Sequence, residues 1–185
     1  MNSGCRKKHK KRRAHLSKIL LLVGASGSGK TTVANELCRK YGLKQIDSYT
    51  TRPPRYDGEA FHTFVSDEEF DRLHDFVGYT EYNGYRYGAT AEQAETHDIY
   101  VIDPAGVEYF RTAYHGSKEV FVAELIVDKS VRIDRMLQRG DGEENAAKRI
   151  AVDEKIFPIK DADIYLTNVD SERTADVIYK FLMQE

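Results

Sequence analysis

Apolar and polar positions alternate along the chain in blocks that predict buried strands separated by amphipathic helices. The run Ile19–Val23 contains no polar residue, as a strand buried on both faces requires, and Thr31–Tyr41 has helical spacing. Two further apolar runs, Ile99–Ile102 and Glu119–Val127, predict strands, and a helix is expected between them at Val107–Tyr114. Strands that alternate with helices predict an α/β fold, with a parallel sheet covered on both faces.

The end of the chain continues this alternation. Asp163–Asn168 predicts a last strand, and Glu172–Met183 predicts an amphipathic helix. In parallel sheets, ligands bind at the carboxyl ends of the strands, where Gly24, Ser48 and Asp103 all fall. The pattern therefore predicts one site at that edge of the sheet.

A segment with a different pattern lies between these blocks. Ser66-Asp67-Glu68-Glu69 fits a capping box, which predicts the start of a helix. Asn83-Gly84 is a strong hairpin signal, and it separates the predicted strands Tyr79–Tyr82 and Tyr85–Tyr87. The segment is expected to be a small mixed insert that presents Tyr87 at the end of a strand.

The positive charge of the chain is concentrated at its amino terminus. The whole chain of 185 residues has a formal net charge of -2, but its first 18 residues carry eight Lys and Arg side chains and no acid, which leaves -10 on the remainder. Such a basic block is expected to stay solvated and disordered, with weak nonspecific contact to nucleic acid as the alternative. It lacks the stacking aromatics of a single-strand binding site.

Length, cysteine content and hydropathy narrow the class of protein. At 185 residues, one compact domain is expected. The two cysteines, Cys5 and Cys38, are too few for a disulfide framework and lack metal-ligand spacing, which favours a reducing compartment. No apolar run approaches the ~20 residues of a membrane span, and no signal-peptide core follows the basic start. A cytoplasmic protein without a membrane partner is expected.

The stretch from Gly24 to Thr31 carries the clearest chemistry. It satisfies G-x-x-x-x-G-K-[ST], and it lies between a predicted buried strand and a predicted helix. In such a P-loop, backbone N–H groups turn towards phosphate, Lys30 reaches the β and γ phosphates of ATP, and Thr31 binds Mg²⁺. A glycine turn that serves packing alone does not account for Lys30-Thr31. The ATP contacts predicted in this stretch are Ala25, Ser26, Gly27, Ser28, Gly29, Lys30, Thr31 and Thr32.

An arginine-bearing loop follows the predicted first helix. Arg52 and Arg55 lie close together in Ser48–Arg55, where two prolines restrict the backbone, and Gly58-Glu59 comes next. A guanidinium can bind phosphate through two parallel hydrogen bonds. Because this loop leaves the sheet beside the P-loop, its two arginines are predicted to bind phosphate.

Several short motifs follow the P-loop in order. They are Ser48-x-Thr-Thr-Arg-x-x-Arg, Gly58-Glu59, Phe64-Val65, Tyr87-Gly88 and Asp103-x-x-Gly106. In this order, and at nearly these spacings, the chain resembles guanylate kinases over about residues 19–182. The resemblance implies a P-loop NTPase three-layer fold with a parallel sheet core, a small mixed β/α NMP-binding insert and a short helical lid.

The resemblance also implies boundaries within the chain. Residues 1–17 are expected to form the basic tail, and residues 18–185 the guanylate kinase-like domain. Within that domain, the core is expected at 18–47 and 98–185, the insert at about 48–97 and the lid at about 136–152.

The activity implied by the resemblance is transfer of a phosphoryl group from ATP to GMP, with Mg²⁺ as the cofactor. In that family, the counterparts of Arg52, Arg55 and Tyr87 hold the GMP phosphate, and lid arginines close over ATP. Arg132 is expected to be a solvated position on the lid helix. The residues implied for GMP are Ser48, Arg52, Arg55, Glu59, His62, Glu81, Tyr87 and Asp103. Those implied for catalysis are Lys30, Arg52, Arg139 and Arg149, and Arg135 and Asn168 join the ATP contacts.

Some positions depart from the family pattern. His62 replaces a phosphate-binding tyrosine, Gly78 replaces the glutamate that reads guanine, and Ala89 replaces a serine. Val101 replaces the first aspartate of a D-x-D motif, and Glu81 is the expected substitute for the missing glutamate. Lost hydrogen-bonding partners predict weaker discrimination among bases than in a standard guanylate kinase, and restoring Glu at 78 with Ser at 89 is expected to sharpen it.

Two other functions stay open. Ribose 1,5-bisphosphate phosphokinases look similar over the P-loop and the T-R-P segment and have a histidine placed like His62, but Asp103 argues against them. Guanylate kinase-like scaffold domains, which bind peptides without turnover, are the second alternative, and the intact Lys30-Thr31 pair argues against them. A monomer and a dimer are both compatible with the sequence.

Overall fold

The computed structural model describes residues 16–54, 57, 59, 62–82 and 84–184. Its main sheet has the strand order β6-β1-β7-β8, and these strands are β1 (Lys18–Gly24), β6 (Ile99–Val101), β7 (Glu119–Ile126) and β8 (Ile164–Thr167). The pairings β1–β6, β1–β7 and β7–β8 are all parallel. The predicted strands are therefore confirmed, and each strand end lies within one residue of its expected place.

Strand β1 is buried at every position because its side chains face two apolar cores. Leu20 and Leu22 point into one cluster, whereas Ile19, Leu21 and Val23 point into the other. Successive side chains of a strand lie on opposite faces, so an unbroken apolar run is what a centrally placed strand requires.

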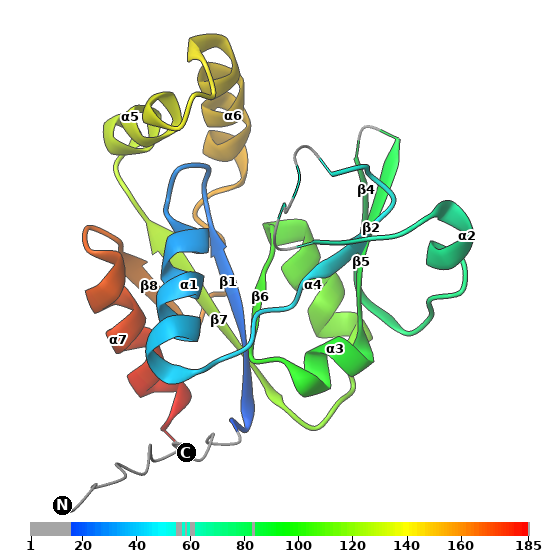
Figure 1. The fold of residues 1–185 in the computed structure, drawn as a ribbon. Coiled ribbons are helices and arrows are strands. Elements are labelled where there is room, and N and C mark those ends of the chain that lie inside the picture. Colours follow the sequence, from blue (N-terminus) through cyan, green and yellow to red (C-terminus); the bar gives the residue numbers. More distant parts are fainter. Residues whose placement is uncertain (1–15, 55–56, 58, 60–61, 83, 185) are drawn as a thin grey trace, which may run out of the picture.

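Helices cover both faces of the main sheet (Figure 1). α1 (Lys30–Tyr41) and α7 (Ser171–Leu182) lie on one face, and α4 (Pro104–Ala113) lies on the other. Gly42 ends α1 in the left-handed conformation, with a φ of 71°. The predicted α/β architecture is confirmed. Among the residues that the structure describes, no helix is long and apolar enough to cross a membrane.

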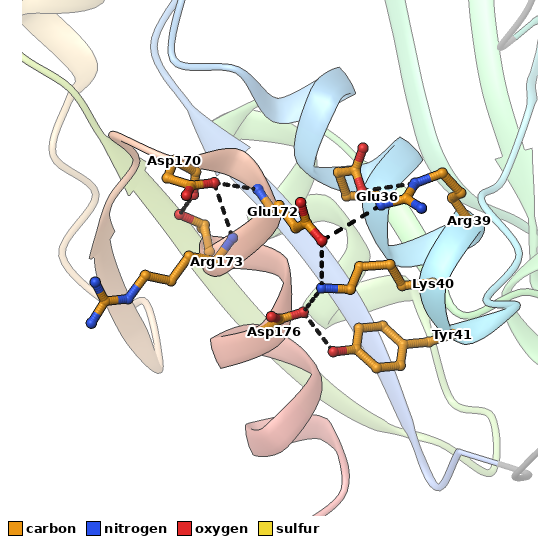
Figure 2. Close-up of polar contacts among 9 residues, drawn as sticks. Glu36, Arg39, Lys40, Tyr41, Asp170, Glu172, Arg173 and Asp176 are labelled. Carbon is orange, nitrogen blue, oxygen red and sulfur yellow. Dashed lines mark hydrogen bonds and ion pairs between the residues drawn. The ribbon is translucent and has the colours of Figure 1, made fainter.

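Polar contacts fasten α7 to α1 at the surface (Figure 2). The Lys40 ammonium lies 2.5 Å from the Asp176 carboxylate, and the Tyr41 hydroxyl donates to the same carboxylate at 2.6 Å. Glu172 lies 3.1 Å from Lys40, and the rings of Tyr41 and Tyr179 stack with their centroids 3.7 Å apart. These contacts hold α7 beside the helix that follows the P-loop.

The insert forms a second sheet in the order β3-β2-β5-β4. Its strands are β2 (Ser48–Thr50), β3 (His62–Phe64), β4 (Phe76–Tyr82) and β5 (Tyr85–Thr90). β2 pairs in parallel with β3 and antiparallel with β5, and β4 and β5 form the predicted hairpin. In its turn Gly84 has a φ of 76°, whereas Asn83 lies outside the described residues.

Two short helices in the insert start with capping boxes. At the start of α2 (Asp67–Phe70), the Ser66 side chain accepts from the Glu69 N–H at 3.1 Å, and the Glu69 carboxylate accepts from the Ser66 N–H at 2.8 Å. This confirms the predicted helix start. The same reciprocal arrangement at Thr90 and Gln93 begins α3 (Ala91–Thr96).

The insert shares an apolar core with the main sheet. Val77 of β4 and Ala89 of β5 lie in one cluster with Ile46, Tyr100 and Phe110. The hairpin is therefore packed onto α4 and β6, and the expected boundaries at 48 and 97 do not divide the molecule into separate cores.

The segment expected to form the lid contains two helices, α5 (Lys129–Gln138) and α6 (Glu143–Ile156), beyond the carboxyl ends of the main strands (Figure 1). We keep the name lid for this helical pair and its link. In the link between them, Gly140 and Gly142 have φ values of 90° and 74°. The helical pair is longer than the expected lid at 136–152, because α5 starts almost directly after β7. The two helices pack together through Met136, Ala146 and Ile150.

The folded part of the chain starts before residue 18, the predicted boundary. Leu16 is buried in the same cluster as Leu20 and Leu37, and the Ser17 carbonyl accepts a hydrogen bond from the Glu119 N–H. The predicted tail is therefore too long by at least two residues, since Leu16 packs in the core. Residues 1–15 lie outside the described residues.

Candidate functional site

The P-loop lies tightly against two neighbouring elements. Gly27 and Gly29 have φ values of 78° and 89°. A Cβ atom on Gly27 would lie 2.6 Å from the Arg132 carbonyl oxygen, and one on Gly29 would lie 2.5 Å from the side-chain nitrogen of Asn168. Glycine at these positions therefore allows both the backbone conformation and the close approach to α5 and the end of β8.

Lys30, the first residue of α1, turns back over the P-loop. Its ammonium donates to the carbonyl oxygens of Gly24 at 2.5 Å and Ala25 at 3.2 Å. Burial lowers the pKa of Lys30 to about 8; the negative charge of Asp153 opposes this shift, and nearby arginines of the lid reinforce it. A phosphate anion beside Lys30 would favour its charged form.

Asp153 links the lid helix α6 to the P-loop. Its carboxylate accepts from the Ser26 N–H at 2.8 Å and lies 3.1 Å from a guanidinium nitrogen of Arg132. Asp153 and Arg132 are each only 7% exposed. The expectation that Arg132 is solvated is therefore wrong, because it forms a buried ion pair. The sequence carries no signal for Asp153, since an acid in a polar helix usually faces solvent.

Asn168, expected among the ATP contacts, directs its side chain into the protein. It is 1% exposed; its amide nitrogen donates to the Ser28 carbonyl at 2.7 Å, and its side-chain oxygen accepts from the Thr174 hydroxyl at 3.0 Å. Its backbone carbonyl accepts from Arg135 at 3.2 Å. Both polar ends of the side chain are thus used inside the protein, where the amide braces the P-loop.

A cavity of about 410 Å³ opens beside the P-loop, and we call it the P-loop cavity. Arg135 of α5 and Arg139, which caps the end of that helix, are four residues apart, and both reach it, as residues on one helix face can. Ser171, which the sequence analysis missed, joins them from the first turn of α7. The lining residues are Gly27, Gly29, Lys30, Thr31, Thr32, Arg135, Arg139 and Ser171.

Asp141, in the link of the lid, gathers two of the arginines. Its carboxylate lies 2.5 Å from Arg139 and 3.7 Å from Arg149. Both arginines are close enough to Lys30 to help lower its pKa. Arg135 in turn donates to the Gly27 carbonyl at 3.3 Å. The structure thus brings the three arginines predicted in the lid around the P-loop.

A second cavity, of about 380 Å³, lies between the main sheet and the insert, and we call it the insert cavity. Lys30 lines both this cavity and the P-loop cavity. The lining residues of the insert cavity are Gly24, Ser26, Lys30, Ser48, His62, Thr80, Tyr87, Tyr100, Val101, Ile102, Asp103, Pro104, Asp153, Ile156 and Phe157.

Arg52 is held beside this cavity by Glu59. The guanidinium donates to the two carboxylate oxygens at 2.8 and 3.2 Å. This pairing raises the pKa of Arg52 above its ordinary value, and the Tyr87 hydroxyl acts in the same direction. Arg55, the other predicted phosphate ligand, lies outside the described residues.

Ser48, His62 and Tyr87 form one cluster in the insert cavity. The Ser48 hydroxyl oxygen lies 3.1 Å from Nδ1 of His62, and the rings of His62 and Tyr87 have centroids 5.8 Å apart. The parallel register that places Ser48 opposite His62 creates this contact. Three residues predicted from separate motifs are thereby brought together.

Asp103 lies at the start of α4 and lines the same cavity. Its carboxylate accepts from the Gly106 N–H at 2.7 Å, and Pro104 occupies the first turn. This cap starts α4 three residues before the predicted helix at Val107, because the sequence pattern marked only the apolar part of the helix.

Glu81 lies away from the insert cavity. Alternate residues of β4 face opposite sides, so Thr80 lines the cavity while Glu81 accepts a hydrogen bond from the Tyr79 hydroxyl at 2.5 Å. Strand register therefore corrects the expectation that Glu81 replaces the missing glutamate. Thr80 and Tyr100 were missed, although Thr80 could have been found from its place two residues after Gly78 in the strand.

Comparison with known proteins gives one consistent family. The sequence model for guanylate kinase matches residues 16–185. A guanylate kinase from Nostoc sp. is 31% identical over 176 residues, which cover 87% of each protein. One from Neisseria meningitidis is 37% identical over 117 residues, and the match spans 56% of this chain but only 57% of that protein.

A solved structure shows the same fold. The crystal structure of guanylate kinase from Anaplasma phagocytophilum superposes with a TM-score of 0.59 at 28% identity. The match covers 89% of this chain and 84% of that one. The P-loop NTPase fold expected from the motifs is therefore confirmed.

Proposed function

This chain belongs to the guanylate kinase family, and we propose that it transfers the terminal phosphoryl group of ATP to GMP, giving ADP and GDP. One observation carries this proposal: Lys30 lines both the P-loop cavity and the insert cavity. A phosphoryl group bound by Lys30 lies where ligands of the two cavities meet. The P-loop cavity accepts ATP, and the insert cavity accepts GMP.

The P-loop cavity suits the phosphates of ATP. The first turn of α1 offers backbone N–H groups and the positive end of a helix dipole. Lys30 adds a cationic side chain, and Arg135 and Arg139 add two more from the lid. We assign the ATP phosphates to residues 25–32 with these arginines, while Asn168 keeps the loop in place.

Mg²⁺ fits the P-loop cavity through Thr31. The Thr31 side chain is exposed there beside Lys30, and a hydroxyl oxygen suits Mg²⁺ when phosphate oxygens and water complete its shell. When bound there, the ion would supply positive charge that offsets the negative charge of the ATP phosphates.

The insert cavity suits the phosphate of GMP. We assign this phosphate to Arg52, Arg55 and Tyr87, with His62 as a further hydrogen-bond donor. Glu59 fixes the Arg52 guanidinium by two hydrogen bonds. A guanidinium held in this way needs little reordering when the acceptor binds. Ser48 and Asp103, which line the same cavity, are assigned to the nucleoside.

The reaction needs no nucleophile or base from the protein. Phosphoryl transfer depends on placing the acceptor oxygen in line and on spreading positive charge along the transferring group. This charge comes from two helices and two loops: Lys30 of α1, Arg149 of α6, Arg52 in the loop after β2 and Arg139 at the end of α5. Closure of the lid over bound ATP would bring Arg139 and Arg149 onto the phosphates.

A cytoplasmic location follows from the same proposal. ATP and GMP are substrates of that compartment, and Cys38, the free cysteine among the described residues, is compatible with reducing conditions.

The proposal is tested by offering the protein Mg-ATP with GMP, AMP or ribose 1,5-bisphosphate and separating the products by chromatography. GMP should yield equal amounts of ADP and GDP. Turnover of the ribose bisphosphate alone would move the acceptor to a sugar phosphate. If the folded protein forms no ADP from Mg-ATP with any of the three acceptors, the chain is a binding module.

A further inference from the structure

Tyr100 contributes the hydroxyl of a largely buried side chain to the insert cavity. It lies in β6, is only 8% exposed, and packs its ring near that of Phe110, with centroids 6.2 Å apart. Among the hydrogen bonds of the described residues, none involves the Tyr100 hydroxyl. A buried tyrosine hydroxyl usually has a partner, so the cavity is where a ligand would supply one.

Gly78 allows Tyr100 to occupy this place. A Cβ atom on residue 78 would lie 2.7 Å from the Tyr100 hydroxyl oxygen and 2.9 Å from its Cε1. Gly78 pairs across the hairpin with Ala89, and these two small residues leave room for the ring. The hydroxyl therefore lies where a side chain of residue 78 would project. This corrects the expectation that Glu at position 78 would restore a contact with the base, because a glutamate side chain there must first displace the Tyr100 ring.

The surroundings keep the Tyr100 hydroxyl neutral. Burial raises its pKa, and the negative charge of Asp103 adds to the effect. Asp103 is the acid that faces it from α4, and that carboxylate already accepts from the Gly106 N–H. Thr80 and Ser48 add two further hydroxyls to the lining of the cavity. This part of the cavity therefore offers neutral groups that both donate and accept hydrogen bonds.

We propose that Tyr100 is a specificity-determining residue whose hydroxyl bonds the base of the acceptor nucleotide, an inference that rests on the proposed function. A carboxylate can only accept hydrogen bonds, which selects bases that present N–H donors. A hydroxyl can also donate to a ring nitrogen or a carbonyl oxygen. The acceptor class is thus purine nucleoside monophosphates, with guanine and adenine both able to bond Tyr100.

Tyr100→Phe tests this, because it removes the hydroxyl and keeps the ring. Calorimetric titration without ATP would give dissociation constants for GMP, AMP and ribose 5-phosphate, which has no base. We expect Tyr100→Phe to raise the dissociation constants for GMP and for AMP by about 3- to 10-fold each, which is the effect of losing one neutral hydrogen bond. The affinity for ribose 5-phosphate and the KM for ATP should not change.

Tyr109→Phe is the matched control. Tyr109 lies on α4 but is 40% exposed and is not part of the cavity lining, so the same chemical change there should leave every constant unaltered. Gly78→Ala is the complementary variant. Its new Cβ atom pushes the Tyr100 ring aside. Gly78→Ala should therefore weaken the binding of GMP and AMP as much as Tyr100→Phe does, although the hydroxyl is still present.

The outcomes separate this inference from the proposed function. Unchanged GMP and AMP affinities in Tyr100→Phe overturn the inference, and so does an equal loss for ribose 5-phosphate, which would indicate a structural effect. A wild type that binds neither nucleotide also overturns it. Binding with the expected Tyr100→Phe loss but without phosphoryl transfer removes the proposed function alone. If the wild type transfers phosphate to GMP but Tyr100→Phe leaves the dissociation constants for GMP and AMP unchanged, only the inference about Tyr100 is overturned.

Discussion

The P-loop cavity is braced by buried polar side chains, whereas the insert cavity is shaped by aromatic packing around small residues. Asn168 and Asp153 reach the P-loop from different elements and bond to its backbone at 2.7 and 2.8 Å. In the insert, the ring of Tyr100 fills the space that Gly78 and Ala89 leave open.

This difference explains why the two cavities depart from the family pattern to different degrees. A loop fixed by buried hydrogen bonds changes at a cost, since an unsatisfied buried group costs about 1–3 kcal/mol. Where apolar side chains pack around small residues, one side chain can replace another at a smaller cost in stability, provided that the total volume is kept. The P-loop motif is accordingly complete, whereas the departures at His62, Gly78 and Ala89 fall in the insert, and Val101 of β6 lines the insert cavity.

The largest expected effect is at the junction of the two cavities. Lys30→Ala should lower kcat with GMP about 100-fold or more and leave the fold intact, because a preorganised charge on the transferring phosphoryl group is lost. Circular dichroism and steady-state kinetics would measure both. Lys148→Ala, on the lid surface with 69% of its side chain exposed, is the control. If the folded Lys30→Ala protein transfers phosphate to GMP at nearly the wild-type rate, the assignment as a kinase is wrong.

Removing the brace of the P-loop should affect one cavity only. Asn168→Ala removes the hydrogen bonds to the Ser28 carbonyl and from the Thr174 hydroxyl, which keeps its bond to the Asp170 carbonyl. The free energy of unfolding should therefore fall by about 1–3 kcal/mol, and the KM for ATP should rise. Val169→Ala, at a neighbouring position that is 83% exposed, should change neither. If the KM for GMP rises as much as that for ATP, the two cavities are not independent.

A smaller effect is expected from pH. Lys30 has a pKa of about 8 in the nucleotide-free protein, and bound phosphate favours its charged form. Affinity for ATP should therefore hold up to about pH 8 and then fall by at most about tenfold per pH unit, with proton uptake on binding. Calorimetry in two buffers of different ionisation enthalpy measures this. A flat profile, with no proton uptake, would show that Lys30 does not contact the phosphates.

The same shift has a consequence for stability. Between pH 8 and 10.5, the folded protein binds fewer protons at Lys30 than the unfolded chain does. The contribution of Lys30 to the free energy of unfolding should therefore rise with pH across that window and be least favourable below it. Wild type minus Lys30→Ala, measured by denaturant unfolding at each pH, isolates this contribution.

The smallest expected effect is outside both cavities. Deleting residues 1–15 should change neither the Tm nor the KM for either substrate, because this basic segment carries few apolar side chains with which to pack. Deleting residues 1–17 should lower the Tm, since Leu16 is buried in the main core. A large loss of activity in the shorter deletion would show that the tail belongs to the site.

What the sequence could predict depended on local signals. The apolar run of β1, the P-loop, the Ser66 capping box and the hairpin are each set by residues close together in the chain. The remaining features depend on contacts between distant segments. Asp153 meets Ser26 across 127 positions, and Asn168 meets Ser28 across 140, so no local pattern marks either residue. The place of Tyr100 depends on the absence of a side chain at Gly78 in another strand.

The most direct test of the account is the ratio of kcat/KM for GMP to that for AMP in the wild-type protein. We expect a P-loop cavity typical of the family beside an acceptor site in which a neutral hydroxyl reads the base. A ratio below about 10³ is expected, because sites that reach 10⁴ to 10⁵ leave a buried group unpaired with the wrong ligand. A GMP preference in that higher range would contradict the account, since Tyr100 can pair with either base.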